Sequence, residues 1–173
     1  MLQRFFFFLG MLTMVHAATP RPLADVPIPT PDQKKINLKQ YRGKVVVLVL
    51  FSTTCGDCVQ TVALMSKIQT EMGPRGLQVV GAAFDENAAY TVEGFGQRYR
   101  PSFPLGFLDQ ASAIKIADIP KDMRPFVPIM MFIDRLGTVR VQYYGNDPVF
   151  KQQDKAFHAI VDSLLKFHPT ATK

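Results

Sequence analysis

The fold is decided by residues 45–58, which read VVVLVLFSTTCGDC. The unbroken apolar run Val45–Phe51 predicts a central strand that is covered on both faces of its sheet. A short polar loop follows, and apolar residues then recur every three or four positions, which predicts a helix over 57–72. Cys55 and Cys58 are the only cysteines of the chain, and they stand between this strand and this helix.

That placement predicts redox chemistry. The unpaired N–H groups and the positive end of the macrodipole at a helix N-terminus favour the thiolate of Cys55, which is the nucleophile in disulfide exchange. The spacing of three residues brings Cys58 within reach, so a mixed disulfide formed at Cys55 can be resolved internally. We therefore predict a redox-active Cys55–Cys58 disulfide as the working group, with no other cofactor.

The two cysteines have two other possible roles, in a metal site or in a structural disulfide. A zinc site needs about four ligands, and after the leader the chain adds only His158 and His168 to the two cysteines, so no metal is expected. A purely structural disulfide across two intervening residues closes too small a loop to restrain the unfolded chain much.

The N-terminus has the pattern of a secretory signal peptide over residues 1–18. Arg4 precedes an apolar stretch over 5–15, and small residues allow cleavage after Ala17 or Ala18. An uncleaved anchor is the alternative, although the stretch is shorter than the roughly 20 residues that span a bilayer. Export, most simply to a bacterial periplasm, would place the dithiol where disulfides persist.

The 173 residues, 47% of them hydrophobic, are enough for one domain with a full core. We predict a proline-rich lead-in over 19–35, which cannot form a regular helix or a central strand, and a domain over 36–168. The formal net charge of +6 is mild and its basic residues are scattered along the chain, which excludes a nucleic-acid partner.

The remaining elements follow from hydrophobic periodicity and from proline and glycine breaks. Beyond the first strand and helix, we predict strands over 36–38, 77–84, 105–108, 129–133 and 138–144, and helices over 88–99, 110–117 and 149–167. The last two strands form a hairpin around a turn with Gly137 at positive φ. This order predicts an α/β fold with a mixed central sheet and helices on both faces.

Three features together resemble the thioredoxin superfamily, and within it the exported TlpA/ResA-like thiol-disulfide oxidoreductases, over residues 36–167. They are the dithiol in FSTTCGDC, the pair Val127–Pro128 before a strand, and the turn FIDRLGTV. The resemblance implies a thioredoxin-like fold, protein thiols and disulfides as substrates, and a membrane redox partner. It also implies that Pro128 is cis and lies beside Cys55, with the backbone of Val127 offered to a client peptide.

The chain departs from the family around the dithiol. Thr54 replaces the usual Trp, Asp57 replaces the usual Pro, and Thr61 stands where relatives commonly carry an acid. We expect Thr54, Gly56 and Asp57 to tune the dithiol, with Gly56 easing the approach of a substrate backbone. The Asp57 carboxylate opposes the helix dipole at Cys55, which predicts a reductant or mild exchanger.

No matched residue inherits the role of proton acceptor. The nearest candidates are Asp85 and Glu86, because they follow the strand over 77–84 at the sheet edge where such folds place their sites. The plainer interpretation is that Asp85 and Glu86 lie in a solvated loop and cap the helix that follows.

Three rival functions remain open. A peroxiredoxin-like peroxidase shares the fold; Ser52 fits its motif, whereas Leu48 stands in place of its proline. A copper carrier on this fold tends to separate its cysteines by three intervening residues, where this chain has two, and to add a histidine before the hairpin, which this chain lacks. An interaction module would not need Cys55 at all.

Overall fold

The computed structural model describes residues 20–120 and 122–167, so the predicted signal peptide lies outside the described residues. Four predicted elements have the expected bounds: strands 45–51 and 129–133, and helices 88–99 and 110–117. No helix within the described ranges is long and apolar enough to cross a membrane. The elements are β1 (Arg21–Pro22), β2 (Ile28–Pro29), β3 (Lys35–Ile36), η1 (Leu38–Tyr41), β4 (Val45–Phe51), α1 (Gly56–Met72), η2 (Gly73–Arg75), β5 (Leu77–Ala83), α2 (Ala88–Tyr99), β6 (Leu105–Phe107), α3 (Gln110–Ala117), β7 (Ile129–Ile133), β8 (Thr138–Tyr143), η3 (Pro148–Gln152) and α4 (Gln153–Lys166).

The helix expected over 57–72 begins one residue earlier, at 56, and the strands expected over 77–84, 105–108 and 138–144 each end one residue earlier. Two further elements differ by more than one residue at a boundary. The strand expected over 36–38 is Lys35–Ile36, because the Asn37 side chain accepts the N–H of Lys39 at 2.9 Å and starts the 3₁₀ turn η1. The last helix was expected from residue 149, but Pro148–Gln152 forms a 3₁₀ turn and α4 begins at Gln153. There the Asp147 carboxylate accepts the N–H of Val149, which favours a tight first turn.

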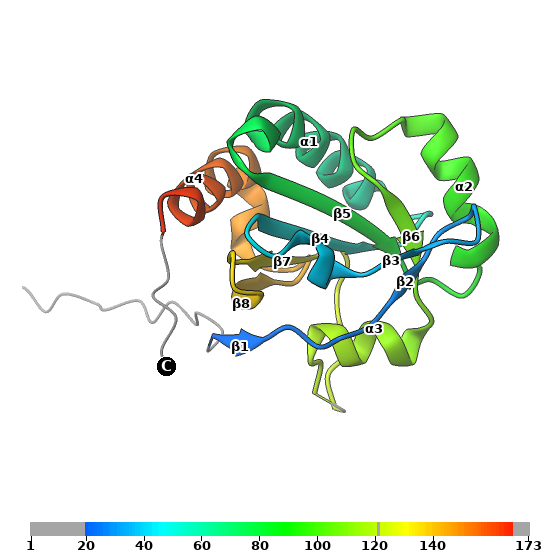
Figure 1. Ribbon diagram of the computed structural model, residues 1–173. Helices are drawn as coiled ribbons and strands as arrows, with labels where there is room; N and C mark the ends of the chain where they lie inside the picture. Colours follow the sequence, from blue (N-terminus) through cyan, green and yellow to red (C-terminus); the bar gives the residue numbers. More distant parts are fainter. Residues whose placement is uncertain (1–19, 121, 168–173) are drawn as a thin grey trace, which may run out of the picture.

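The main sheet has the strand order β1-β8-β7-β4-β5-β6 (Figure 1). Strand β4 pairs in parallel with β5 and antiparallel with β7, so the sheet is mixed, as predicted. All seven residues of β4 are buried, which confirms that the apolar run forms a central strand. Because β4 and β5 are parallel and in register, the loops that follow Phe51 and Ala83 meet at one edge of the sheet.

Alternate side chains of β4 enter two cores, one on each face of the sheet. Helices α1, α2 and α4 pack on one face with Val45, Val47, Val49 and Phe51. Helix α3 and the lead-in pack on the other face with Val46, Leu48 and Leu50. Figure 1 shows α1 and α4 on the opposite side of the sheet from α3, so helices cover both faces as predicted.

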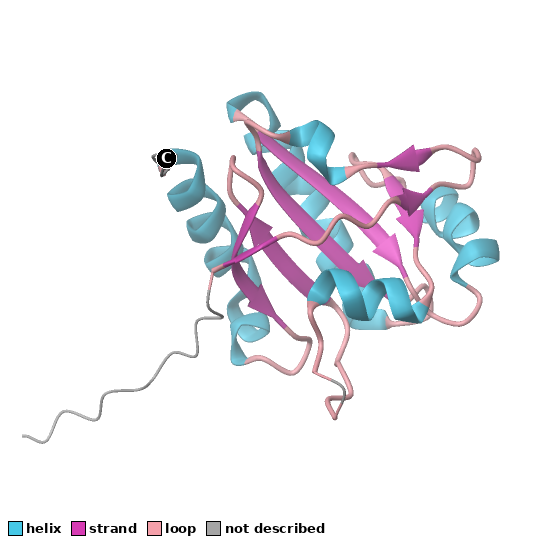
Figure 2. Ribbon diagram, turned by 60° about the horizontal axis from the view of Figure 1, so that its bottom comes forward, coloured by secondary structure: helices cyan, strands magenta, loops and turns pink. Residues whose placement is uncertain are grey.

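The proline-rich lead-in belongs to this second core. Strand β1 pairs antiparallel with β8 at the sheet edge, and Ile28 of β2 is fully buried. Figure 2 shows the lead-in running across the same face of the sheet as α3. The segment therefore helps to cover the sheet while forming only edge or isolated strands, which agrees with its prolines.

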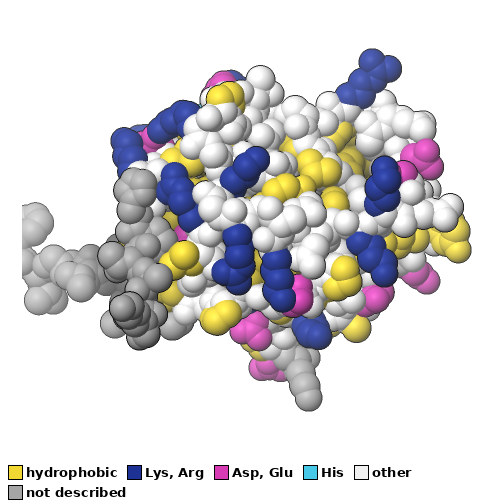
Figure 3. Space-filling view, in the orientation of Figure 1, with side chains coloured by type: hydrophobic (Ala, Val, Ile, Leu, Met, Phe, Trp, Pro, Cys, Tyr) yellow, Lys and Arg dark blue, Asp and Glu magenta, His cyan; other side chains and the backbone are white. Residues whose placement is uncertain are grey.

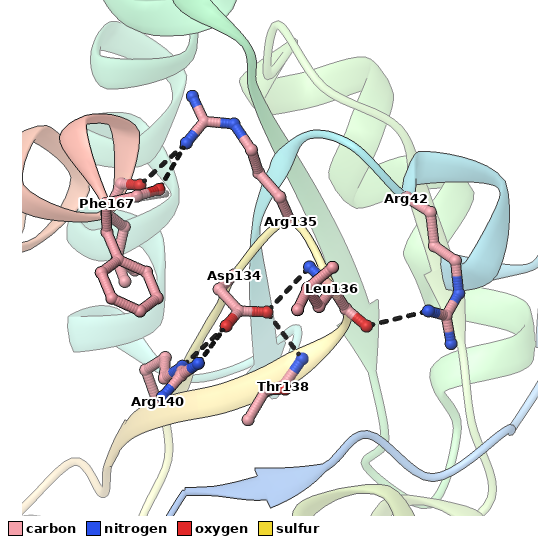
Figure 4. Close-up of polar contacts among 8 residues, drawn as sticks. Arg42, Asp134, Arg135, Leu136, Thr138, Arg140 and Phe167 are labelled. Atoms are coloured by element: carbon pink, nitrogen blue, oxygen red, sulfur yellow. Dashed lines mark hydrogen bonds and ion pairs between the residues drawn. The ribbon is translucent and has the colours of Figure 1, made fainter. Parts of the chain in front are cut away.

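The β7–β8 hairpin is closed by a buried carboxylate (Figure 4). Asp134 accepts the N–H groups of Leu136 at 2.9 Å and Thr138 at 3.0 Å, and it pairs with Arg140 at 2.7 Å. Gly137 has φ +80°, as the turn predicts. Arg135 points the other way and donates to the last carbonyls of α4, at 2.8 Å to Leu165, which fastens the hairpin to that helix.

Basic side chains do not gather in one patch on the face seen in Figure 3, where Lys and Arg are spread over the surface between uncharged side chains. Several of the described ones are paired with acids, such as Arg75 with Asp162 at 2.6 Å and Lys166 with Asp162 at 2.7 Å.

Candidate functional site

Cys55 is the N-cap residue of α1. Its extended backbone, with φ −90° and ψ 121°, ends the loop after β4, and its Sγ accepts the N–H of Cys58 at 3.2 Å. A sulfur thus fills the position where a capping residue usually supplies an oxygen. This geometry confirms that Cys55 faces the unpaired N–H groups of the helix start.

The two thiols, both free, differ in exposure: Cys55 is half-buried, and Cys58 is fully buried. Burial raises the pKa of the Cys58 thiol well above its ordinary value, and a hydrogen bond with the Cys55 side chain adds to this effect. A hydrogen bond from the Ser52 backbone opposes this rise in the pKa of Cys58, and the charges at Cys55 and Asp57 add smaller contributions that raise it. Cys58 is therefore held as a protonated thiol behind an accessible Cys55.

Asp85 holds the loop that leads into Cys55. The N–H of Thr53 donates to one oxygen of its carboxylate at 2.6 Å, and the Thr53 hydroxyl lies 3.3 Å from the other. The same hydroxyl meets that of Thr91 on α2 at 2.9 Å. Asp85 is thus brought to the dithiol loop, as its place after β5 predicted, but both of its oxygens are directed at Thr53. Its role as a proton acceptor stays a prediction.

Glu86 is exposed, and together with Asp85 it lines a groove of about 790 Å³ along the carboxyl ends of β5 and β6. Phe84, Phe107 and Leu108 supply apolar walls to this groove, and Asp109 caps α3 by accepting the N–H of Ser112 at 2.7 Å. The Glu86 side chain is therefore a groove residue, and a proton-accepting role for it also stays a prediction.

The three expected tuning residues lie at the surface: Thr54, Gly56 and Asp57 are all exposed. A Cβ built on Gly56 would meet nothing within 4 Å, so the surface beside Cys55 is open to an approaching chain. Asp57 lies in the first turn of α1, where the helix dipole favours its charge.

The Val127–Pro128 peptide bond is cis, as the resemblance implied. It immediately precedes β7, whose register with β4 brings Ile129 opposite Leu50, near the end of the strand that leads to Cys55. Val127 is half-buried and packs against the same core cluster as Cys55 and Cys58. Its neighbour Phe126 is 57% exposed, so this loop presents an aromatic ring to solvent.

The sequence did not reveal a polar pair beneath the dithiol, in which one side chain is buried and the other half-buried. Thr61, one helical turn after Cys58, is fully buried, and its hydroxyl donates to the side-chain oxygen of Gln153 at 2.9 Å. Gln153 is the first residue of α4 and lies 92 positions along the chain. The sequence shows that Thr61 replaces the acidic residue common in relatives, but it does not identify Gln153 as the partner of Thr61.

Within 20–120 and 122–167, no three His, Cys, Asp or Glu side chains are grouped so that they could hold a metal ion. His158 is engaged with Glu71 at 2.9 Å and with Asp154 at 2.8 Å, and His168 lies outside the described residues. Leu48, in the place of the peroxidase proline, is buried in β4 opposite Val80 and Met131. The Ser52 hydroxyl is bonded to that of Thr54 at 3.1 Å.

The chain is similar to curated proteins named thiol-disulfide oxidoreductase ResA. It is 26% identical over 112 residues to those of Bacillus thuringiensis subsp. konkukian and Bacillus cereus, which covers 65% of this chain. The match spans 61% of the length of each of these relatives.

Solved structures share the thioredoxin-like fold. A thiol:disulfide interchange protein of the thioredoxin family from Chlorobium tepidum TLS superposes with a TM-score of 0.71 at 22% identity, covering 86% of this chain and 98% of that one. A DsbF homologue from Corynebacterium diphtheriae gives a TM-score of 0.68 at 15% identity, with coverage of 84% and 87%. The model of the AhpC/TSA family matches residues 20–142, from the lead-in into β8. Because this match covers well over half of the sequence, the chain belongs to the AhpC/TSA family.

Proposed function

We propose that this protein is an exported thiol-disulfide oxidoreductase that exchanges disulfides with protein substrates through Cys55 and Cys58. The observation that carries the proposal is the asymmetry of the dithiol: the half-buried Cys55 sulfur caps the helix by accepting the backbone N–H of Cys58 at 3.2 Å, whereas the Cys58 side chain is fully buried. The printed name of the ResA relatives supports the same activity.

In the reducing direction, the Cys55 thiolate attacks one sulfur of a client disulfide, and the other client sulfur leaves as a thiolate that takes up a proton. Cys58 then loses its proton and attacks the Cys55 sulfur of the mixed disulfide, which releases the second client sulfur. The client gains two electrons and the protein ends as the Cys55–Cys58 disulfide. A membrane redox partner would return the two electrons.

Asp57 supports the reducing or mildly exchanging direction, because its exposed carboxylate adds to the cost of thiolate charge in the dithiol. The pattern of residues 1–18 supports export to the periplasm, with cleavage after Ala17 or Ala18. Among the tuning and acceptor candidates, Asp85 acts in our proposal by holding Thr53, and so the Cys55 loop, in place.

The test is reduction of a disulfide-bonded protein by the purified chain from residue 19, followed with wild type, Cys55→Ser and Cys58→Ser. We expect Cys58→Ser to accumulate a covalent adduct with the client through Cys55, visible by mass spectrometry, and Cys55→Ser to form none. Exchange that persists in Cys55→Ser would refute the proposal. Titration of the dithiol against glutathione gives the reduction potential of the Cys55–Cys58 disulfide, and so the direction of electron flow. A potential as oxidising as that of a dedicated disulfide donor would contradict the proposal that the protein is a reductant.

The peroxidase alternative is separated in the same preparation by mixing the reduced protein with hydrogen peroxide in a stopped-flow instrument. We expect oxidation of Cys55 by peroxide to be slow in comparison with its reaction with the client disulfide.

A further inference from the structure

The loop between β4 and α1 is held by side chains from two other parts of the fold. Strands β4 and β5 stay joined at their ends, because the Phe84 N–H donates to the Phe51 carbonyl at 3.0 Å. Asp85 therefore lies beside the loop and accepts the N–H and the hydroxyl of Thr53, at 2.6 and 3.3 Å. The hydroxyl of Thr91 on α2 meets the same Thr53 hydroxyl at 2.9 Å. Thr53 is thus fixed by two side chains that lie 32 and 38 positions further along the chain.

Ser52, the residue before Thr53, is bonded to both cysteines. Its carbonyl accepts the N–H of Cys55 at 3.3 Å, and a hydrogen bond from its backbone lowers the pKa of the Cys58 thiol, against the larger effect of burial. The donor of that second bond is the Ser52 N–H, because the N–H is the only donor of a peptide backbone. Among the contributions to the pKa of Cys58, the Ser52 bond is the one that favours the thiolate.

The Cys55 sulfur is stabilised in a different way. It accepts the N–H of Cys58, which belongs to α1 itself, at 3.2 Å. A small shift of Ser52 and Thr53 leaves that bond in place, but it takes the Ser52 N–H away from the Cys58 sulfur. The position of the loop therefore bears on the step in which Cys58 acts, and much less on the attack by Cys55.

We propose that Asp85 and Thr91 are positioning residues that clamp Thr53 and so aim the Ser52 N–H at the Cys58 sulfur during release of the client. The proposal rests on the function proposed above. In the release step Cys58 gives up its proton and its sulfur bonds to the Cys55 sulfur. The bond between Cys55 and the client breaks, and the client sulfur leaves with the electron pair and takes up a proton. The Ser52 N–H stabilises the negative charge on Cys58 before it attacks, so loosening Thr53 slows release.

The first test is Thr91→Val, which keeps the shape of the side chain and removes the hydroxyl. Release is followed by mixing the reduced variant with insulin as the disulfide-bonded client, quenching with acid and measuring the decay of the covalent adduct by mass spectrometry. Attack is measured separately, as formation of the adduct in a Cys58→Ser background. We expect release to slow about fivefold through loss of one hydrogen bond, with attack unchanged within about twofold. Thr91→Ser, which retains the hydroxyl, should restore release.

Thr70→Val is the matched control. Thr70 and Thr91 are both exposed on helices, and each hydroxyl donates to the carbonyl four residues earlier at 3.0 Å. The Thr70 hydroxyl also meets a second hydroxyl, that of Ser102 at 3.3 Å, but Ser102 belongs to the segment before β6 and not to the dithiol loop. Thr70→Val should change neither rate. A wild-type release rate in Thr91→Val, equal slowing of release in both variants, or attack slowed as much as release would overturn the proposal.

Asp85 is tested with two substitutions that separate holding the loop from accepting a proton. Asp85→Ala removes both bonds to Thr53, and we expect release to slow about tenfold. Asp85→Asn keeps an oxygen that accepts the Thr53 N–H, and release should slow only about twofold. A loss in Asp85→Asn as large as in Asp85→Ala would show that Asp85 acts by its charge, as a proton acceptor does, and would refute its role in the clamp.

If Asp85→Ala does not fold, as judged by circular dichroism, Thr91→Val and Asp85→Asn decide, because a slowing in Asp85→Asn greater than in Thr91→Val would contradict the clamp. Failure of the proposed function is recognised separately, since wild type itself would then form no adduct with insulin and reduce none of it.

Discussion

At the level of single residues, the surroundings of the two sulfurs divide their roles. Cys58 lies at 0% exposure, and burial is the largest cause of its raised pKa, so it stays protonated until a mixed disulfide brings a sulfur to it. Asp57 is the one charged side chain between the two cysteines, and from the exposed first turn of α1 its charge helps to raise the pKa of the Cys58 thiol. Its charge is therefore the simplest single determinant of the redox potential to change.

Replacing Asp57 with Asn should make the disulfide more oxidising. Loss of the negative charge stabilises thiolate, and so the reduced form; since about 30 mV corresponds to about 1.4 kcal/mol, we expect a rise of tens of millivolts. The measurement is an equilibrium titration against glutathione. Glu93→Gln, an exposed acid on α2, is the control and should leave the potential unchanged. An equal shift in both variants would contradict a specific role for Asp57.

At the level of elements, helices α1 and α4 are joined by two polar contacts as well as by the core. Thr61 donates to Gln153 near the dithiol, and Glu71 near the other end of α1 pairs with His158 of α4. The first contact holds the buried Thr61, one helical turn after Cys58, against the half-buried Gln153, so it fixes α4 against α1 next to the dithiol.

The Thr61–Gln153 contact should be measurable in stability. Thr61→Val keeps the shape of the side chain but removes the donor, and a typical net hydrogen bond contributes about 1 kcal/mol to the free energy of unfolding. We therefore expect Thr61→Val to lower the free energy of unfolding of the oxidised protein by about 1 kcal/mol, as measured by urea denaturation. Thr70→Val, on the exposed face of the same helix, controls for the effect of Val on α1 and should cost clearly less. Equal losses of unfolding free energy in the two variants would show that the Thr61–Gln153 hydrogen bond adds nothing to stability.

At the level of the whole molecule, stability should depend on pH through His158. Burial works against its charged form, but hydrogen bonds to Glu71 and the Asp154 carbonyl, with the charges of both acids, outweigh burial and raise its pKa. A raised pKa in the folded state stabilises the protein below the unfolded value of about 6.5, and this contribution is lost as the pH rises through the folded pKa.

We therefore expect the free energy of unfolding of the oxidised protein to fall as the pH is raised from below about 6.5 through the pKa of folded His158. Urea denaturation at a series of pH values measures this, and use of the oxidised form removes the titration of Cys58. His158→Gln should flatten the dependence in that window. A slope that is the same in the variant would assign it to other groups.

Local pattern alone determined the main elements and the dithiol. The apolar runs of β4 and β7, the periodicity of α2 and α3, and the breaks at Gly73, Pro74 and Gly137 act over a few residues, so their bounds could be predicted. Cys55 at the start of a helix is likewise a local fact. The cis Val127–Pro128 bond was predictable only through the family resemblance.

The contacts around the dithiol depend on the tertiary structure. Asp85 reaches Thr53 across 32 positions of the chain, Thr61 reaches Gln153 across 92, and Gly145 reaches Val127 through the β7–β8 pairing. Each pairing is set by strand register and helix packing between segments that are distant in sequence. Hydrophobic periodicity says which face of an element is buried but not which residue it meets there, and so these partners emerged only from the folded chain.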